Sequence, residues 1–226
     1  AFMSSKDDTE KLTFHVVRET RSGSIFSAVV PRKGVSETDV SVDHMLECIS
    51  ELGYSNSKIY VKNDQEPAIK AVIQGVIERR SASTLLEESP VGSSSSNGAV
   101  ESAVSTAGRG IRKLRIALEN NYNIKIPIKH NIVPWLVAHS SFCHNRYQVG
   151  HDGRVPYSRI RGKPFNAPIC EFAENVFYKV PKRLIGPELN KWDDKWSTGL
   201  FLGIRTHSNE MFIGTSTGVV KCRTIR

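Results

Sequence analysis

The stretch Lys58-Ile-Tyr-Val-Lys-Asn-Asp-Gln-Glu66 decides the fold, because in it a strand leads directly into a helix. Residues 58–62 predict a short strand. Beyond them, apolar residues from Ile69 to Ile77 recur at helical spacing and predict an amphipathic helix, in whose first turn Pro67 is tolerated. A strand followed closely by a helix is typical of layered α/β domains.

Upstream of this stretch the sequence predicts a β-hairpin and a helix. The runs Leu12–Arg18 and Ser24–Val30 are rich in β-branched and aromatic residues, and Gly23 lies in the turn between them. Apolar residues from Val42 to Leu52 then follow helical spacing and stop at Gly53, which suits the C-terminal cap of a helix. The predicted order is therefore β-β-α-β-α, a mixed α/β layered domain.

Downstream, residues 85–88 predict a short strand, and Gly92–Ser96 predict a flexible loop in which Ser93–Ser96 are loop residues and not nucleophiles. A long helix should run from about Val100 to Leu118, with Gly108-Arg-Gly110 as a weak point where it can kink. Another helix is predicted over about 130–148.

After Gly150 the pattern changes. Residues 153–164 are basic and rich in turn-forming residues, and short apolar runs then alternate with turns up to the end of the chain. These runs predict a small β-barrel or sheet. We therefore expect an α/β core over residues 1–170 and a small β-rich domain over residues 171–226.

The charge is unevenly distributed. The chain has a formal net charge of +8, yet residues 1–108 carry 11 Lys and Arg against 15 Asp and Glu, whereas residues 109–226 carry 20 against 8. Such asymmetry indicates a polyanionic partner, and a solvated basic face is the alternative. No apolar run approaches the roughly 18 residues of a membrane span, and no amphipathic basic helix has a broad aromatic face, so nucleic acid is favoured over a membrane.

The four cysteines lie far apart, which makes a disulfide framework or a zinc ribbon improbable. Cys143 could share a helical face with His139 and His144, but these residues do not make a four-ligand site. The free thiols favour a reducing, intracellular compartment.

Two carboxylates are candidates for chemistry. Asp64 directly follows the predicted strand, and in α/β folds the C-terminal edge of the strands is where ligands and metals are held. Glu101 lies one turn into the predicted long helix. Each has a structural explanation when taken alone, because Asp is a favoured N-cap and glutamate in a first turn is favoured by the helix dipole.

Taken together, the two positions form a pattern. An Asp at a strand end, 36 intervening residues and a Glu in Asn97-Gly98-x-x-Glu101 resemble the D-D-E signature of retroviral-type integrases. The hairpin, Glu51-Leu-Gly-Tyr54 and Lys62-Asn-Asp-Gln-Glu66 are similar to the integrase catalytic cores of LTR retrotransposon polyproteins, of copia-like type. Phe172–Lys179 and Trp196–Gly203 resemble the strand-rich segment downstream of those cores, so the likeness covers essentially the whole chain.

This resemblance implies an RNase H-like mixed sheet with flanking helices, followed by a small barrel-like domain. It also implies metal-dependent 3′-end processing and strand transfer, with Asp64 and Glu101 as catalytic and metal-binding residues. Two Mg²⁺ or Mn²⁺ ions about 3.5–4 Å apart would serve an in-line phosphodiester displacement.

One feature departs from the family. In the family, the first of the three acidic residues is an aspartate that normally stands on the first strand, shortly before an aromatic-x-Phe run. Ala1-Phe2-Met3 resembles the remainder of that strand, so we expect this aspartate upstream of residue 1. Asp7 and Asp8 are the alternatives, although they follow Ser-Ser-Lys, which is typical of a loop.

The expected partners are the DNA ends of the element and target DNA, bound in the nucleus by a homo-oligomer and without a membrane. Two basic clusters are candidates for phosphate contacts, namely Arg109, Arg112, Lys113 and Arg115 on the long helix and Arg154, Arg159, Arg161 and Lys163 after it. A catalytically inactive or domesticated DNA-binding or assembly module with the same fold is the alternative function.

Overall fold

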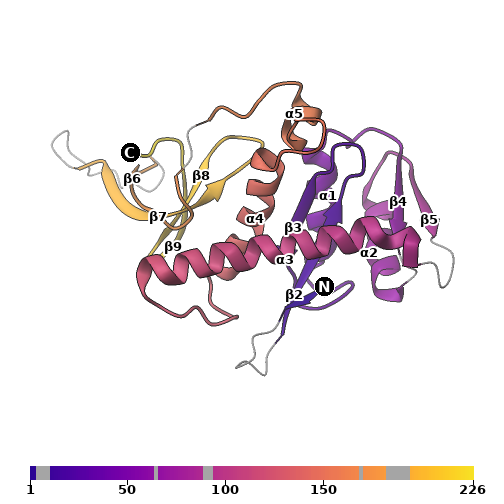
Figure 1. Cartoon of the computed structure of the whole chain (residues 1–226), viewed down its shortest axis with the longest axis horizontal. Coiled ribbons are helices and arrows are strands. Elements are labelled where there is room, and N and C mark those ends of the chain that lie inside the picture. Colours follow the sequence, from indigo (N-terminus) through magenta and orange to yellow (C-terminus); the bar gives the residue numbers. More distant parts are fainter. Residues whose placement is uncertain (4–10, 64–65, 89–93, 168–169, 182–193) are drawn as a thin grey trace. The chain divides into compact units, whose positions relative to one another are not determined.

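The computed structural model describes residues 1–3, 11–63, 66–88, 94–167, 170–181 and 194–226 (Figure 1). The strands are β1 (Phe2–Met3), β2 (Leu12–Arg18), β3 (Ile25–Val29), β4 (Ile59–Asn63), β5 (Thr84–Glu88), β6 (Asn175–Lys179), β7 (Trp196–Ile204), β8 (Met211–Thr215) and β9 (Gly218–Cys222). The helices are α1 (Val40–Glu51), α2 (Pro67–Arg79), α3 (Ser94–Tyr122), α4 (Val133–Tyr147) and α5 (Pro156–Arg161). No helix among these residues is long and apolar enough to span a membrane.

The predicted hairpin and the following helix are confirmed. Strands β1, β2 and β3 form an antiparallel sheet in that order, with Phe14 of β2 opposite Val29 of β3. The turn uses Gly23 at φ 78°, and Gly53 follows α1 at φ 83°. Both backbone conformations are left-handed, and glycine adopts them at little energetic cost because it has no Cβ.

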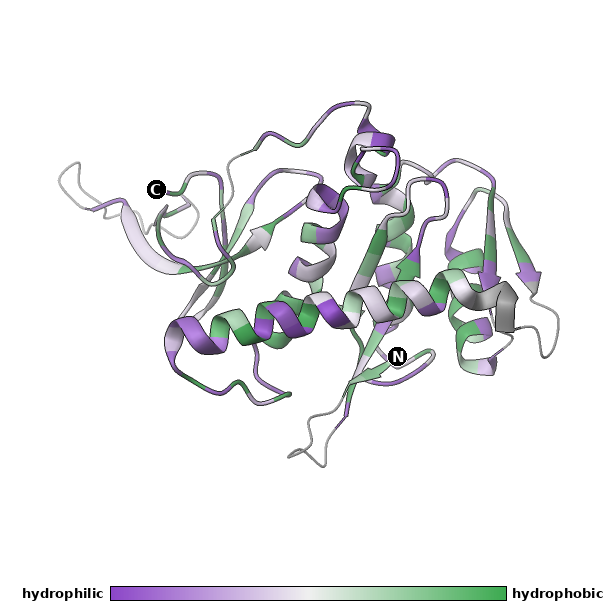
Figure 2. Cartoon of the chain, in the orientation of Figure 1, coloured by the Kyte–Doolittle hydropathy of each residue, from purple (hydrophilic) through white to green (hydrophobic). Residues whose placement is uncertain are grey.

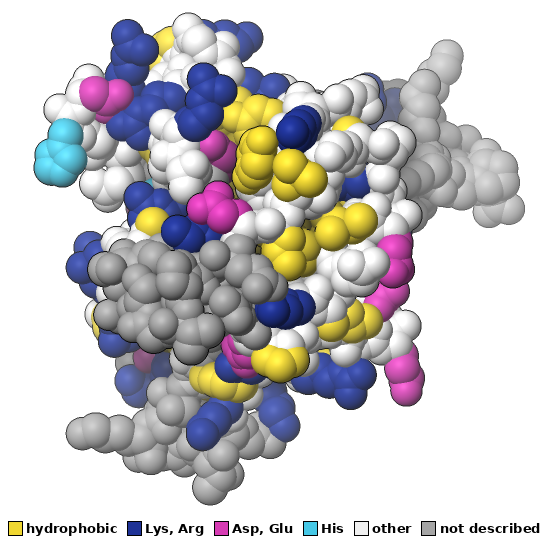
Figure 3. Space-filling model, turned by 90° about the vertical axis from the view of Figure 1, so that its right-hand side faces the viewer, with side chains coloured by type: hydrophobic (Ala, Val, Ile, Leu, Met, Phe, Trp, Pro, Cys, Tyr) yellow, Lys and Arg dark blue, Asp and Glu magenta, His cyan; other side chains and the backbone are white. Residues whose placement is uncertain are grey.

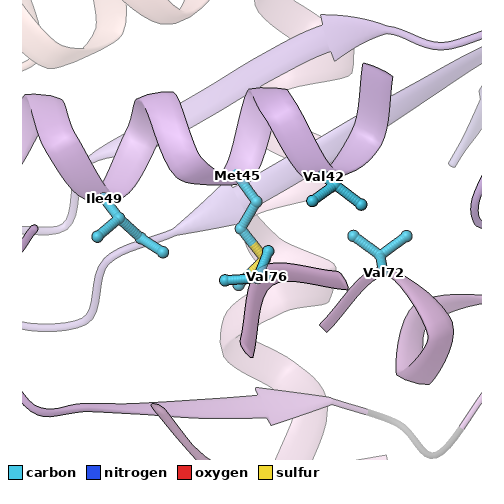
Figure 4. Packing of buried hydrophobic residues seen from close by; sticks show 5 residues of the cluster. All are labelled: Val42, Met45, Ile49, Val72 and Val76. Carbon is cyan, nitrogen blue, oxygen red and sulfur yellow. The ribbon is translucent and has the colours of Figure 1, made fainter. Parts of the chain in front are cut away.

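Strands β4 and β5 pair in parallel, and helices α1 and α2 cover one side of the pair. The apolar residues of the two helices point toward one another and are almost fully buried (Figure 4): Val42, Met45, Ile49, Val72 and Val76. Two inward-facing residues of β4, Ile59 and Val61, pack against this cluster. Removing each such side chain from water contributes about 1.5–3 kcal/mol, so this cluster fixes the register of β4.

Helix α4 is held on β3 by buried hydrogen bonds. The side-chain amide of Asn145 accepts a hydrogen bond from the Ile25 N–H and donates one to the Ile25 carbonyl, each at 2.8 Å. The Ser27 hydroxyl donates to the Val137 carbonyl at 3.0 Å. The Asn145 side chain therefore satisfies both backbone groups of Ile25, and the Ser27 side chain fixes β3 to α4 at a second point.

Helix α3 begins earlier than the sequence predicted. Ser94–Ser96 belong to its first turn, so the prediction that they form a loop was wrong. Along α3 the hydropathy alternates between green and purple, as expected of an amphipathic helix (Figure 2). The helix also continues unbroken through Gly108 and Gly110. Gly110 lies against Ser140 of α4, since a Cβ at Gly110 would be 2.3 Å from the Ser140 Oγ.

We therefore expect opposite effects of alanine at the two glycines of α3. Gly108→Ala should raise the free energy of unfolding by about 1 kcal/mol, because nothing lies within 4 Å of the new methyl group. Gly110→Ala should lower it by about 1–2 kcal/mol through overpacking against Ser140. Urea denaturation measures both. Adding Ser140→Ala should restore stability to the Gly110→Ala variant, and a Gly110→Ala variant as stable as Gly108→Ala would contradict the close contact.

Residues 156–161 form the helix α5, where the sequence had predicted turns. Pro156 occupies its first turn, and Gly162 ends it at φ 68°. The side chain of Ile160 packs against the buried residues Phe26 and Leu52. This tertiary contact stabilises the short helix, and the basic composition of the stretch gives no sign of it.

The C-terminal strands form an antiparallel sheet in the order β6-β7-β8-β9. Phe201, Ile213 and Tyr178 lie in its buried core. Arg226 pairs with Phe177 of β6 through two backbone hydrogen bonds, so the segment after β9 returns to the first strand. This pairing brings the two sheet edges together, which is consistent with the predicted small β-rich domain.

The chain divides into two compact units. One comprises Ala1–Ile116 with Ile124–Phe165, and the other comprises Ala117–Asn123 with Asn166–Arg226. The end of α3 belongs to the second unit, where the Tyr122 hydroxyl donates to the Ala173 carbonyl at 2.5 Å. The domain limits expected from the sequence, 1–170 and 171–226, stay a prediction.

Candidate metal and nucleic-acid site

Asp64 lies outside the described residues, but the chain on both sides of it is described. Asn63 ends β4 and is paired with Glu88 at the end of β5. Glu66 precedes α2 and forms an ion pair with Lys33 at 2.7 Å. The sequence position between the end of a strand and the start of a helix is therefore confirmed, whereas the role of Asp64 as a metal ligand stays a prediction.

Glu101 lies two turns into α3 and is exposed. The region around it is tied to the antiparallel sheet, because Arg18 at the end of β2 donates from Nη1 to the carbonyl of Ala99 at 2.9 Å. That the carboxylates of Asp64 and Glu101 come together at one metal site stays a prediction. No cluster of three or more His, Cys, Asp or Glu residues able to hold a metal occurs among the described residues.

The arginines of α3 lie on the same side of the helix as Glu101, whereas Lys113 is rotated from it by about 120°. At 100° per residue, Arg112 is rotated from Glu101 by only about 20°, and Arg109 and Arg115 lie within about 80° of it. Arg109, Arg112 and Lys113 are exposed, and Arg115 is half-buried. Arg112 is about 16 Å along the axis from Glu101. The helix thus presents a carboxylate and a row of cations to the same side.

The second basic cluster is partly engaged within the protein. Arg159 forms an ion pair with Asp152 and also donates to the carbonyls of Ser22 and Arg154. The hydrogen bonds that Asp152 accepts from the Arg159 guanidinium and from the Arg154 N–H hold its pKa well below the usual value. Arg161 donates to the Glu51 carbonyl at 3.1 Å. Arg154 and Lys163 are exposed. Arg159 therefore stabilises the turn before α5, and the assignment of these four residues to DNA binding stays a prediction.

A partly buried histidine pair was missed in the sequence, because its members lie on different elements. The Nδ1 atoms of His15 on β2 and His44 on α1 are 3.2 Å apart, and the Cys48 Sγ lies 3.5 Å from the other ring nitrogen of His44. The pKa of His15 is lowered to about 4 and that of His44 to about 3, mainly by burial and to a smaller extent by the N-terminal ammonium group on His15 and by repulsion between the two rings on His44. Both rings are therefore neutral at pH 7.

This pair should make the protein less stable in mild acid. The folded-state pKa of each ring lies below the unfolded value of about 6.5, so the unfolded chain binds more protons and stability falls as the pH decreases. From about pH 7.5 to about pH 5 we expect a loss of about 2 kcal/mol per histidine. Urea denaturation at the two pH values should show a loss that is smaller by about 4 kcal/mol in a His15→Leu/His44→Leu variant, in which His139, whose pKa burial also lowers to about 4, still contributes. The exposed His151→Leu variant should retain the full loss. Equal pH dependence in all three proteins would contradict the assignment.

Comparison with known proteins shows similarity at the level of structure. No protein-family model matches the chain, and no curated protein matches it. A chain of the simian T-cell lymphotropic virus intasome, solved by cryo-EM in complex with PP2A regulatory subunit B56 gamma, is 17% identical at a TM-score of 0.54, with 100% of this chain and 76% of that chain covered. The HTLV-2 integrase catalytic core domain in complex with magnesium, in a trimeric form, is 17% identical at a TM-score of 0.50, with 71% of this chain and 91% of that chain covered. At this identity the likeness concerns the fold alone, and the α/β unit has the fold of a retroviral integrase catalytic core.

Proposed function

We propose that this chain is an integrase catalytic core of an LTR retrotransposon, of copia-like type, that processes and joins DNA ends by metal-dependent polynucleotidyl transfer. The proposal is supported by a fold similar to integrase cores together with two sequence positions: Asp64 comes directly after the last residue of β4 in the chain, and Glu101 stands on the side of α3 that also bears its arginines. A copia-like origin rests on the sequence resemblance.

The donor chemistry of the site fits a hard divalent cation. Asp64 and Glu101 supply carboxylate oxygens, the ligands that Mg²⁺ and Mn²⁺ prefer, and Glu101 is exposed and able to receive an ion together with its water. A pair of such ions, when bound, activates the attacking oxygen and stabilises the leaving 3′-oxygen.

In this mechanism, the residues of the chain bind and orient the DNA. Asp64 and Glu101 would hold the ions, and the reaction needs no covalent intermediate on the protein. Arg109 and Arg112, which face the same side of α3 as Glu101, bind phosphates and keep the duplex in line with Glu101. Water as the nucleophile results in end processing, and a DNA 3′-hydroxyl results in strand transfer. We place this activity in the nucleus and in a homo-oligomer.

The proposal is tested with the purified chain, and with a longer polypeptide containing it, on labelled duplex DNA. We expect joined products with Mg²⁺ or Mn²⁺ and none with a chelator, whereas DNA binding persists in both. Two or more phosphate contacts imply an affinity loss of about tenfold or more between about 50 and 200 mM salt. Binding without joining in either polypeptide would favour the non-catalytic DNA-binding module, and absence of both would exclude integration.

A further inference from the structure

Exposed and inward-facing side chains alternate along β4 and the residue that precedes it. Lys58, Tyr60 and Lys62, which we call the β4 stripe, are exposed, and the Tyr60 side chain is 65% accessible. The intervening residues Ile59 and Val61 pack into the core around α1 and α2. Because side chains alternate along a strand, this buried set holds the stripe toward solvent.

Strand β5 widens the same face. Tyr60 is in register with Leu85, which is 39% exposed, and Lys62 is in register with Glu87. The Lys62 Nζ is 3.9 Å from the Glu87 carboxylate, and both side chains are largely exposed. Figure 3 shows this side of the molecule, where apolar side chains gather with lysine and arginine side chains among them.

The chemistry of the stripe suits a nucleotide. The tyrosine ring offers a flat surface on which a base can stack, and ammonium groups on either side of it can contact phosphates. The Lys58 Nζ lies 5.3 Å from the Tyr60 ring centroid, and Lys58 forms no ion pair within the described part of the chain. An apolar surface of a partner protein would instead remove water from the Lys58 ammonium group and offer it no ionic or hydrogen-bonding partner in return.

We propose that the β4 stripe, together with Leu85, binds an unpaired nucleotide at an end of the DNA substrate. The inference rests on the proposed function, because it names how that same site receives a DNA end. A base inside a duplex has both faces covered by its neighbours, so the base that stacks on Tyr60 lies at the end of the duplex, where an unpaired base can turn its free face to the ring. Tyr60 precedes the last residue of β4 by roughly 10 Å, which places the bound nucleotide near the strand end that leads to Asp64.

The experiment compares two DNA probes, a blunt duplex and the same duplex with a short single-stranded overhang containing the fluorescent base 2-aminopurine. Affinities are measured by fluorescence anisotropy for the wild type, Tyr60→Ala and Tyr60→Phe. The exposure of Tyr60 lets both variants fold, which an unchanged Tm verifies. Arg112→Ala serves as the contrasting variant, since a phosphate contact on α3 should weaken binding of both probes equally.

We expect the wild type to prefer the overhang probe by about 5-fold or more, within the range that stacking on an aromatic side chain supplies. Tyr60→Ala should abolish this preference and the quenching of 2-aminopurine, Tyr60→Phe should keep both, and neither should change affinity for the blunt duplex. A preference that survives in Tyr60→Ala, or is absent from the wild type, would overturn the proposal. If the blunt duplex is neither bound nor joined but Tyr60-dependent overhang binding persists, the proposed function fails and the stripe stands as a single-strand site.

Discussion

Glu101→Gln or Asp64→Asn is expected to abolish metal-dependent joining of DNA. Each change replaces a charged ligand with a neutral amide of the same size, so the loss should exceed the roughly 100-fold that is typical when only an outer-shell partner of a metal is removed. DNA binding should change little, because the arginines of α3 remain. Product formation with Mg²⁺ and affinity by anisotropy are measured on the same preparations, using a polypeptide in which the wild type joins DNA.

Glu78→Gln is the matched control. Glu78 is an exposed glutamate on α2 and contacts Gln74, far in sequence from both candidate ligands. Its variant should join DNA like the wild type. Joining at the wild-type rate by Glu101→Gln would remove Glu101 from the proposed site, and the same result with Asp64→Asn would remove Asp64.

Arg146→Ala is expected to lower the free energy of unfolding by about 3 kcal/mol. The Arg146 side chain is 4% exposed and lies 4.0 Å from the Glu51 carboxylate. Its guanidinium carbon stands 3.8 Å from the ring centroid of Phe142 and within 5.2 Å of those of Phe165 and Tyr157. Truncation removes desolvated cation–π contacts, leaves a cavity and takes the partner from Glu51.

Two further substitutions separate these causes. Arg146→Lys keeps the charge but loses the planar contact with the rings, and should cost less than Arg146→Ala. Arg146→Met fills the space without a charge and should cost least if packing dominates. Urea denaturation resolves the three. A cost below about 1 kcal/mol for Arg146→Ala would show that the aromatic residues close over the space.

Much of the α/β unit was predictable because its signals are local. The runs around Phe14 and Phe26 have strand composition, Gly23 and Gly53 mark positions of positive φ, and Pro67 marks the start of α2. In each case the residue type and its immediate neighbours suffice, since they set the backbone preference directly.

Other features depended on partners distant in sequence. The start of α3 at Ser94 was missed because a serine-rich run has loop composition, and α5 was missed because its support is the contact of Ile160 with Phe26 and Leu52. The distinction between Gly108 and Gly110 likewise required the position of Ser140. None of these contacts leaves a pattern in the local sequence.

The site divides in the same way. The residue types and spacing of Asp64 and Glu101, and the arginines that follow at helical intervals, come from the sequence, because carboxylates, cations and periodicity are properties of the chain itself. Only tertiary packing decided that Tyr60 faces solvent, that Arg146 is enclosed by aromatic rings and that Arg159 is engaged with Asp152. Burial and pairing depend on contacts between segments that are far apart in the sequence, and these contacts form only when the chain folds.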